Sequence, residues 1–83
     1  MSNNEIADKL RERARDLWNR RKNLYRVKAY RRAAEMLLRL DRPVEELFHE
    51  RGEPALKAIP GIGGRLAKTI AHFLESGQLP ERN

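Results

Sequence analysis

The chain has 83 residues and a mass of 9.7 kDa, which leaves room for one compact domain and excludes a separate polymerase or ATPase domain within it. With 40% hydrophobic and 36% charged residues, the composition is too apolar for a disordered tail and too charged for a membrane span. The lack of cysteine excludes disulfides and thiolate-bound zinc. Because no leader-like segment follows Met1, we expect a cytoplasmic protein that engages no membrane.

The charge of the chain is positive and unevenly distributed. There are 18 Lys and Arg against 12 Asp and Glu, a net charge of +6, which favours nucleic acid or another anionic surface as the partner. Residues 20–32 hold seven cations and no acid, whereas residues 41–59 hold three cations and five acids. We therefore expect a polyanion to meet the first segment. The alternative is a basic surface that only keeps the protein soluble.

A first amphipathic helix is predicted to start near Asn3 or Asn4, either of which can serve as its N-cap. The apolar residues that recur on one face of this helix are Ile6, Leu10, Ala14 and Leu17. Trp18 lies at the edge of that face, where the sequence favours packing over stacking on a base. A polar connection at residues 21–23 then leads to a second helix.

The second predicted helix has a core face and a basic back. Its core-facing residues are Tyr30, Ala33, Ala34 and Leu37. The cations on the opposite face are Lys28, Arg32 and Arg39, with Glu35 among them. This helix should therefore pack on one side while it offers positive charge on the other.

A short third helix is predicted after Pro43, because proline suits the first turn and acids near a helix start are favoured by its dipole. Its inner residues should be Val44, Leu47 and Phe48, and Gly52 should end it. A brief helical turn at residues 54–58 precedes a last helix, which stops at Gly77. The inner residues of that last helix are Leu66, Ile70, Phe73 and Leu74. The pattern as a whole predicts an all-α fold, a compact bundle of four main helices, in a single domain over residues 1–83.

The turn at residues 60–64, PGIGG, joins the last two helical segments. Gly61 and Gly63 can adopt φ values that other residues avoid, and they let another backbone come close. Ile62 is expected to plug between two short helices and make the turn rigid. Such a turn before a helix aims backbone N–H groups outward, a site suited to phosphate, to which Arg65 and Lys68 would add charge. The alternative is a tight connection without a ligand.

Two segments carry a resemblance to known proteins. Residues 56–74, LKAIPGIGGRLAKTIAHFL, resemble a helix-hairpin-helix motif, a sequence-tolerant binder of the DNA backbone that would span about residues 54–76. Residues 23–37, NLYRVKAYRRAAEML, followed by RPVEEL, resemble the N-terminal domain of the DNA polymerase beta, or family X, group, bacterial members especially. The resemblance implies a nucleoid-associated protein that binds gapped or single-stranded DNA at a 5′-phosphate, in DNA repair or related DNA metabolism. It also implies a repair or replication protein as a second partner.

The resemblance also assigns site residues. It implies that Tyr25, Arg26 and Tyr30 face the DNA strand and its phosphate. Core packing is the alternative for both tyrosines, and it is favoured for Tyr30. The full set expected to bind DNA is Tyr25, Arg26, Lys28, Tyr30, Arg31, Arg32, Gly61, Gly63, Gly64, Arg65 and Lys68. No cofactor is expected to be required. The family's hairpin often holds a sodium or potassium ion, which here would bind the main-chain carbonyls of Lys57, Ile59 and Ile62.

Catalysis is not expected. In animal members of the group, a lysine forms a Schiff base with 5′-deoxyribose phosphate and β-elimination follows. The matching position here is Thr69, whose hydroxyl cannot form an imine. Lys68 is rotated from it by about 100° around the helix, and the position of a second family lysine falls near Glu81. A weak lyase remains the first alternative to DNA binding alone.

A protein-interaction module is the second alternative. It would use the acidic third helix, with Val44, Leu47 and Phe48 as contacts if they are exposed. The acids of that helix, Glu45, Glu46 and Glu50, otherwise indicate a solvated face. His49 and His72 lie on separate predicted helices and are expected to be exposed rather than bound to zinc.

Overall fold

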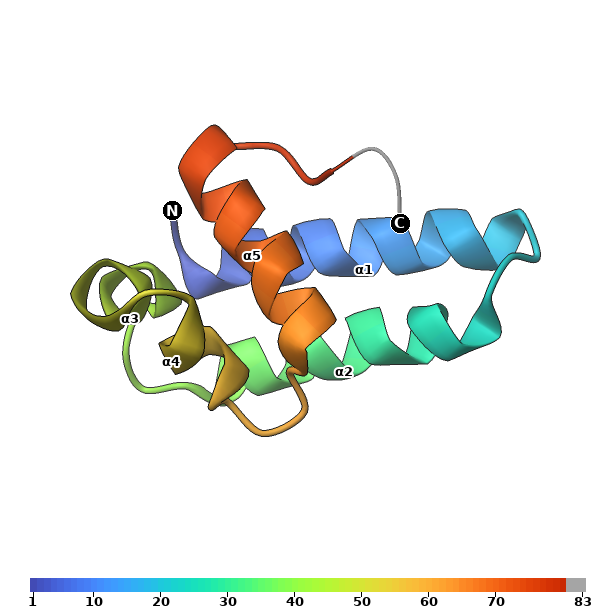
Figure 1. The fold of residues 1–83 in the computed structure, drawn as a ribbon. Helices are drawn as coiled ribbons and strands as arrows, with labels where there is room; N and C mark the ends of the chain where they lie inside the picture. Colours follow the sequence, from blue (N-terminus) through green and yellow to red (C-terminus); the bar gives the residue numbers. More distant parts are fainter. Residues whose placement is uncertain (81–83) are drawn as a thin grey trace.

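The computed structural model describes residues 1–80, and every regular element within them is helical. The five helices are α1 (Asn3–Asn19), α2 (Leu24–Arg39), α3 (Val44–Arg51), α4 (Glu53–Lys57) and α5 (Gly64–Ser76) (Figure 1). The prediction of an all-α bundle with four main helices and one brief helical turn, here α4, is confirmed. None of the helices within residues 1–80 has the length and apolar character needed to cross a membrane.

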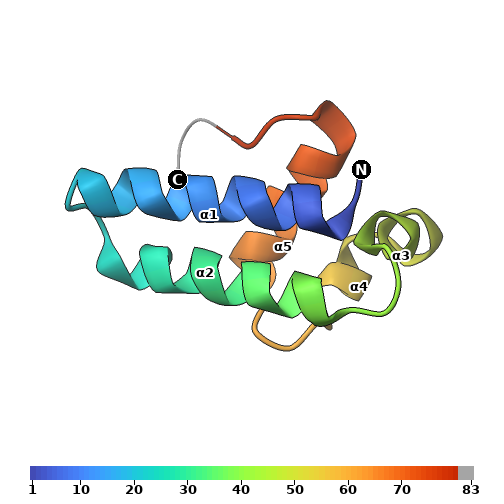
Figure 2. The same cartoon turned by 180° about the vertical axis from the view of Figure 1, so that it is seen from behind.

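The two longest helices, α1 and α2, run antiparallel and lie side by side in both views of the ribbon (Figures 1 and 2). Helix α5 crosses this pair, and α3 and α4 lie at the end away from the α1–α2 turn. The hairpin between α4 and α5 reaches α2. The core lies between α1, α2 and α5 and also includes Val44 of α3 and Leu56 of α4, and the hairpin lies beside α2.

The core contains most of the residues that the helical periodicity predicted. Side chains buried as expected are Ile6, Leu10, Ala14, Tyr30, Ala33, Ala34, Leu37, Val44, Leu66, Ile70 and Phe73. Leu17, Leu47, Phe48 and Leu74 are only half-buried. Trp18 was expected to pack, but 52% of it is exposed: it lies one residue before the end of α1, where the Arg31 guanidinium of α2 lies over its ring.

The start of α1 differs from the expectation. Ser2, not Asn3 or Asn4, is the N-cap: its Oγ accepts the Glu5 N–H at 3.1 Å, and the Glu5 carboxylate accepts the Ser2 N–H at 2.8 Å. The Ser2 backbone N–H also holds the pKa of Glu5 below its ordinary value. Asn3 instead joins α1 to α3, since its Oδ1 accepts the Val44 N–H at 2.7 Å and its Nδ2 donates to the Arg42 carbonyl at 2.8 Å.

The helix ends follow the sequence signals. Gly52 is the C-cap of α3, and its N–H donates to the Phe48 carbonyl at 2.7 Å. Gly77 ends α5 in the left-handed conformation, with φ of 80°, and its N–H donates to the Phe73 carbonyl. Both stops were predicted from glycine at the end of an apolar periodic segment.

The hairpin at residues 58–63 is rigid for two reasons. Ile62 is buried, as predicted, and its N–H donates to the Ile59 carbonyl at 3.0 Å. Gly61 has φ of +87° and lies so close to α2 that a Cβ there would stand 3.0 Å from Met36 Cγ. Gly63 does not use the same freedom, since its φ is −85°. The hairpin therefore lies against α2 at Gly61.

Candidate nucleic-acid interface

Neighbouring side chains in the first turn of α2 differ in exposure. Asn23 is the N-cap, with a left-handed φ of 41°, and its Oδ1 accepts the Arg26 N–H at 3.2 Å. Tyr25 follows it and is 83% exposed, whereas Arg26 is buried. An exposed aromatic ring thus lies next to a cation that the fold holds in place.

Arg26 is tied to Tyr30, one turn further along α2. Its Nη2 donates to the Tyr30 hydroxyl at 3.0 Å, and its guanidinium carbon lies 5.4 Å from the centre of the Tyr30 ring. Tyr30 is fully buried, so the core interpretation is confirmed and a stacking role for its ring is excluded in this structure. Arg26 forms part of a wall instead of reaching into solvent.

Helix α5 begins without the groups that usually satisfy a helix N-terminus. Gly63 provides no side-chain cap, and the first turn contains no acid. The first intrahelical bond runs from the Ala67 N–H to the Gly63 carbonyl at 2.9 Å, so the N–H groups of residues 64–66 have no acceptor within the helix. These amides and the positive end of the helix dipole favour an anion at this point.

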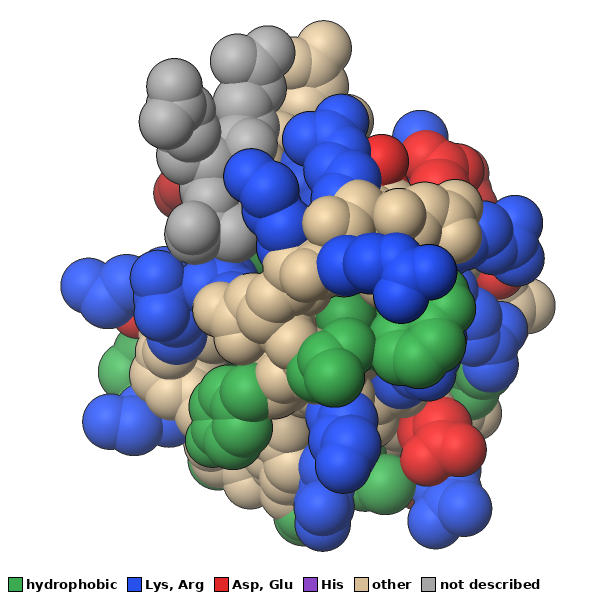
Figure 3. Space-filling model, turned by 90° about the vertical axis from the view of Figure 1, so that its right-hand side faces the viewer, with side chains coloured by type: hydrophobic (Ala, Val, Ile, Leu, Met, Phe, Trp, Pro, Cys, Tyr) green, Lys and Arg blue, Asp and Glu red, His purple; other side chains and the backbone are tan. Residues whose placement is uncertain are grey.

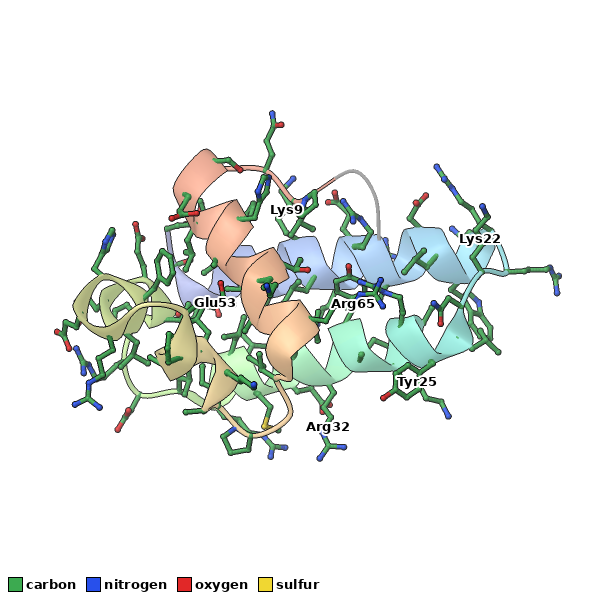
Figure 4. All side chains as sticks on the ribbon, in the orientation of Figure 1. Lys9, Lys22, Tyr25, Arg32, Glu53 and Arg65 are labelled. Carbon is green, nitrogen blue, oxygen red and sulfur yellow. The ribbon has the colours of Figure 1, made fainter. Side chains whose placement is uncertain are left out.

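The start of α2 and the start of α5 enclose a groove of about 470 Å³. Figure 4 shows Arg65 on α5 above the part of α2 that carries Tyr25 and Arg32. The residues that line this α2–hairpin groove are Asn23, Tyr25, Arg26, Lys28, Ala29, Tyr30, Arg32, Gly61, Gly63, Arg65 and Leu66. Four of them are Lys or Arg, and among these described residues none is acidic. The groove is therefore a positively charged concavity.

The groove brings together eight of the eleven residues that the sequence assigned to DNA binding, and omits three. Arg31 lies instead over the ring of Trp18, with its guanidinium carbon 5.8 Å from the ring centre. Gly64 faces the Lys57 side chain, since a Cβ there would stand 3.7 Å from Lys57 Cε. Lys68 is exposed but lies outside the groove.

The groove also contains three residues that sequence reasoning missed, which are Asn23, Ala29 and Leu66. Asn23 carries a readable signal, because asparagine just before an amphipathic segment is a typical N-cap. Ala29 and Leu66 offer no such signal, since each is small or apolar and reaches the groove only through the way α2 and α5 meet.

The carbonyls expected to hold a monovalent cation lie in the hairpin. The Ile59 carbonyl accepts the Ile62 N–H at 3.0 Å, which leaves its second lone pair available. Carbonyl oxygens are ligands that hard cations accept, and Lys57, Ile59 and Ile62 provide them within six consecutive residues. The monovalent cation at these carbonyls stays a prediction from the resemblance.

The two positions that match the family's lysines, Thr69 and Glu81, carry no amine. Thr69 is buried, and its Oγ1 donates back to the Arg65 carbonyl at 3.1 Å. Glu81 lies outside the described residues. His49 and His72 are both exposed, on α3 and α5, and no three His, Cys, Asp or Glu side chains within residues 1–80 come together as metal ligands.

The acidic face of α3 is partly neutralised. Arg42 Nη2 lies 3.3 Å from a Glu46 oxygen and 2.9 Å from a Glu50 oxygen. The Met1 ammonium donates to Glu45 at 2.6 Å and holds the pKa of that carboxyl below its ordinary value. Val44, a proposed contact for a protein partner, is fully buried and is therefore unavailable for that role.

The fold and the groove together define a small helical domain that presents hairpin amides beside a basic helix. Comparison with protein families gives the same answer: the family model described as "Helix-hairpin-helix domain" matches residues 1–79, so the chain belongs to the helix-hairpin-helix domain family. A comparison with curated proteins found no match. Family membership indicates DNA as the partner and binding without sequence preference.

Proposed function

We propose that the chain is a non-catalytic domain that binds gapped or single-stranded DNA through its backbone, with a terminal 5′-phosphate in the α2–hairpin groove. The observation that carries this proposal is the groove itself. It combines the uncapped start of α5 with the cations Lys28, Arg32 and Arg65, and no described residue of its lining is acidic.

A terminal phosphate suits this groove better than an internal one. A phosphomonoester carries about −1.5 to −2 charges near neutral pH and three acceptor oxygens, whereas a phosphodiester carries a single charge. The amides at residues 64–66 can donate to these oxygens, and Arg65 can add a charge-assisted, bidentate contact. A groove with several cations gains most from the more highly charged group.

Tyr25 supports a preference for an unpaired strand. Its ring lines the groove and is 83% exposed, so one face is available to a base. Stacking of a base on an aromatic side chain requires a base that is not stacked on both sides within a duplex, and it works for any sequence. A gap or a single strand next to the 5′-phosphate meets that requirement.

Two further parts of the proposal rest on the resemblance to family X polymerases. One is a role in DNA repair or a related process, together with a repair or replication protein as a partner. The other is a sodium or potassium ion on the hairpin carbonyls, which would neutralise phosphate charge without taking part in chemistry. The absence of catalysis is supported by Thr69, which stands where the lyase members have their lysine.

Fluorescence anisotropy tests the proposal with three labelled DNAs: a gapped duplex with a 5′-phosphate, the same gap without it, and an intact duplex. We expect tightest binding to the phosphorylated gap. Equal affinity for all three would show a general backbone clamp, and no binding at all would contradict the proposal in favour of a protein-interaction module. Trapping with borohydride on a 5′-deoxyribose-phosphate end should give no covalent adduct above that of a protein with scattered surface lysines.

A pair of charge reversals locates the site. Arg65→Glu removes a groove cation and places an acid among the hairpin amides, so it should weaken binding to the phosphorylated gap at least tenfold, which is one phosphate contact of about 1.4 kcal/mol. Arg51→Glu makes the same change of charge on an exposed residue of α3 and should have a much smaller effect. Equal losses in the two variants would remove the groove from the binding site.

A further inference from the structure

The α1–α2 turn exposes apolar side chains in a basic setting. Among the described residues, five large hydrophobic side chains are exposed, and three of these lie within residues 18–25: Trp18, Leu24 and Tyr25. Figure 3 looks onto this end of the molecule and shows hydrophobic side chains among many Lys and Arg and fewer Asp and Glu. Exposed apolar groups concentrated at one place indicate a contact surface.

Trp18 is held in position from α2. The Arg31 guanidinium carbon lies 5.8 Å from the centre of its ring, a cation–π contact that joins the end of α1 to α2. The ring nevertheless remains 52% exposed. A large aromatic ring that is fixed on one side and open on the other loses little conformational entropy when a flat partner stacks on it.

A hollow of about 290 Å³ lies beside the ring, lined by Trp18, Asn19, Arg21 and Leu24. Its backbone is well defined, since the Arg21 N–H donates to the Trp18 carbonyl and the Lys22 N–H to the Leu17 carbonyl, both at 3.0 Å. Arg21 has a left-handed φ of 57°, an unusual conformation for a residue with a side chain. The turn is thus a shaped surface, which we call the turn platform: Trp18, Arg21, Leu24 and Arg31.

The charges around the turn platform select the kind of partner. The cations on or next to it are Arg20, Arg21, Lys22 and Arg31. The acid of α1 closest in sequence, Asp16, is already 3.3 Å from Arg20. An apolar protein surface would have to remove water from these cations without compensation, whereas phosphates on either side of a stacked base would neutralise them.

We propose that the turn platform stacks an unpaired nucleobase of single-stranded DNA, on Trp18 beside Leu24, outside the α2–hairpin groove. This inference rests on the proposed function, because it extends the strand that the groove would hold. Tyr25 lines the groove and its neighbour Leu24 lines the hollow, so the two sites come together at the start of α2, where a strand that leaves the groove over Tyr25 would meet the platform. The domain would then hold a phosphate and at least one base beyond it.

Trp18 is the single tryptophan of the chain, so its fluorescence reports on the platform alone. The full chain is titrated with a labelled oligothymidylate of about 12 nucleotides, a length within the span that single-strand binders cover. A strand of equal length with the same phosphates but abasic sugars serves as the control. Anisotropy of the label reports binding anywhere, and quenching of Trp18 reports stacking. We expect both strands to bind and only the thymidylate strand to quench.

Substitutions give a second readout. Trp18→Ala should weaken binding of the thymidylate strand roughly 5- to 150-fold, the range expected for one stacked base, and leave binding of the abasic strand within about twofold. Trp18→Phe keeps a ring and should restore part of the affinity. Leu38→Ala truncates an exposed apolar residue elsewhere on α2 and is the matched control, which should bind both strands like the unchanged protein.

The outcomes separate this inference from the proposed function. Binding of both strands with no quenching, or equal quenching by the abasic strand, would overturn the platform and leave the groove intact. Loss of all binding would contradict the proposed function and the platform together. A concentration-dependent increase in mass that Trp18→Ala abolishes would assign the surface to a second copy of the chain and would likewise overturn the proposal.

Discussion

The Arg26 guanidinium donates a hydrogen bond to the hydroxyl of Tyr30, and both side chains are buried one turn apart on α2. The pair lines the groove, so a cation there is held by the core and not by a flexible surface side chain. A buried charge is tolerated only where hydrogen bonds replace the water that it has lost. The shape of the groove therefore depends on an interaction inside the fold.

Tyr30→Phe is expected to lower the free energy of unfolding by about 1–3 kcal/mol, because it removes a hydrogen bond to a charged group and keeps the ring. Urea denaturation followed by circular dichroism measures the change. Tyr25→Phe removes a hydroxyl from the same helix at an exposed position and should change stability by less than about 0.5 kcal/mol. If the two variants unfold alike, the Arg26–Tyr30 bond contributes nothing to stability.

Two glycines of the hairpin should respond differently to alanine. Gly61→Ala places a Cβ at φ of +87°, 3.0 Å from Met36 Cγ and 3.1 Å from Arg32 Nε. We expect it to lower the free energy of unfolding by about 1–3 kcal/mol, through backbone strain and displacement of the hairpin from α2. Gly63 has φ of −85°, and a Cβ there would meet nothing within 4 Å. Gly63→Ala should therefore lower the free energy of unfolding by about 1 kcal/mol or less, the effect of a change at an N-cap.

The glycine substitutions also test the groove as a phosphate site, if thermal unfolding is used to check that each variant is folded and anisotropy to measure its affinity for DNA. Gly63→Ala should stay folded and still weaken binding to the phosphorylated gap severalfold, because its methyl group would stand between a phosphate and the amides at the start of α5. An unchanged affinity in a folded Gly63→Ala protein would show that no phosphate approaches the hairpin there.

Asn3 should matter more for stability than its position near the N-terminus suggests. Its side chain makes two hydrogen bonds, to the Val44 N–H and the Arg42 carbonyl, that join α1 to the start of α3. Asn3→Ala is expected to cost about 1–3 kcal/mol, since each bond contributes about 0.5–1.5 kcal/mol. Asn4→Ala, at the neighbouring exposed position, should change the midpoint of urea unfolding little, and equal effects would refute the role assigned to Asn3.

Salt should weaken DNA binding, and the steepness of the loss should report how many phosphates the protein neutralises. If about four phosphates are neutralised, the logarithm of the association constant should fall with the logarithm of salt concentration with a slope near −3 to −4. Affinity would then fall roughly a hundredfold over a fourfold rise in salt. Arg65→Gln should reduce the slope by about one, whereas Arg51→Gln should not; a slope that stays the same in both would place Arg65 outside the contact.

Much of the candidate site could be predicted from the sequence. The basic segment at residues 20–32 and the PGIGG turn pointed to the two elements that form the groove, and glycine marked the helix ends at Gly52 and Gly77. The capping box of Ser2 and Glu5 was also readable, since serine followed three residues later by glutamate is its signature, although Asn3 and Asn4 were expected instead. These features are local, because they depend on residues a few positions apart.

The arrangement of the site was decided by the tertiary structure. Three features of the site depend on residues far away in the sequence. They are the burial of Arg26, the position of Arg31 over Trp18 instead of in the groove, and the bond from Asn3 to α3 in place of a cap on its own helix. Helical periodicity gives the face of a residue but not what that face meets. The sequence by itself determined the helices, their ends and the hairpin, since backbone propensity and apolar spacing act locally. Packing of α5 across α1 and α2 decided which cations share a groove, because burial is a property of the assembled fold.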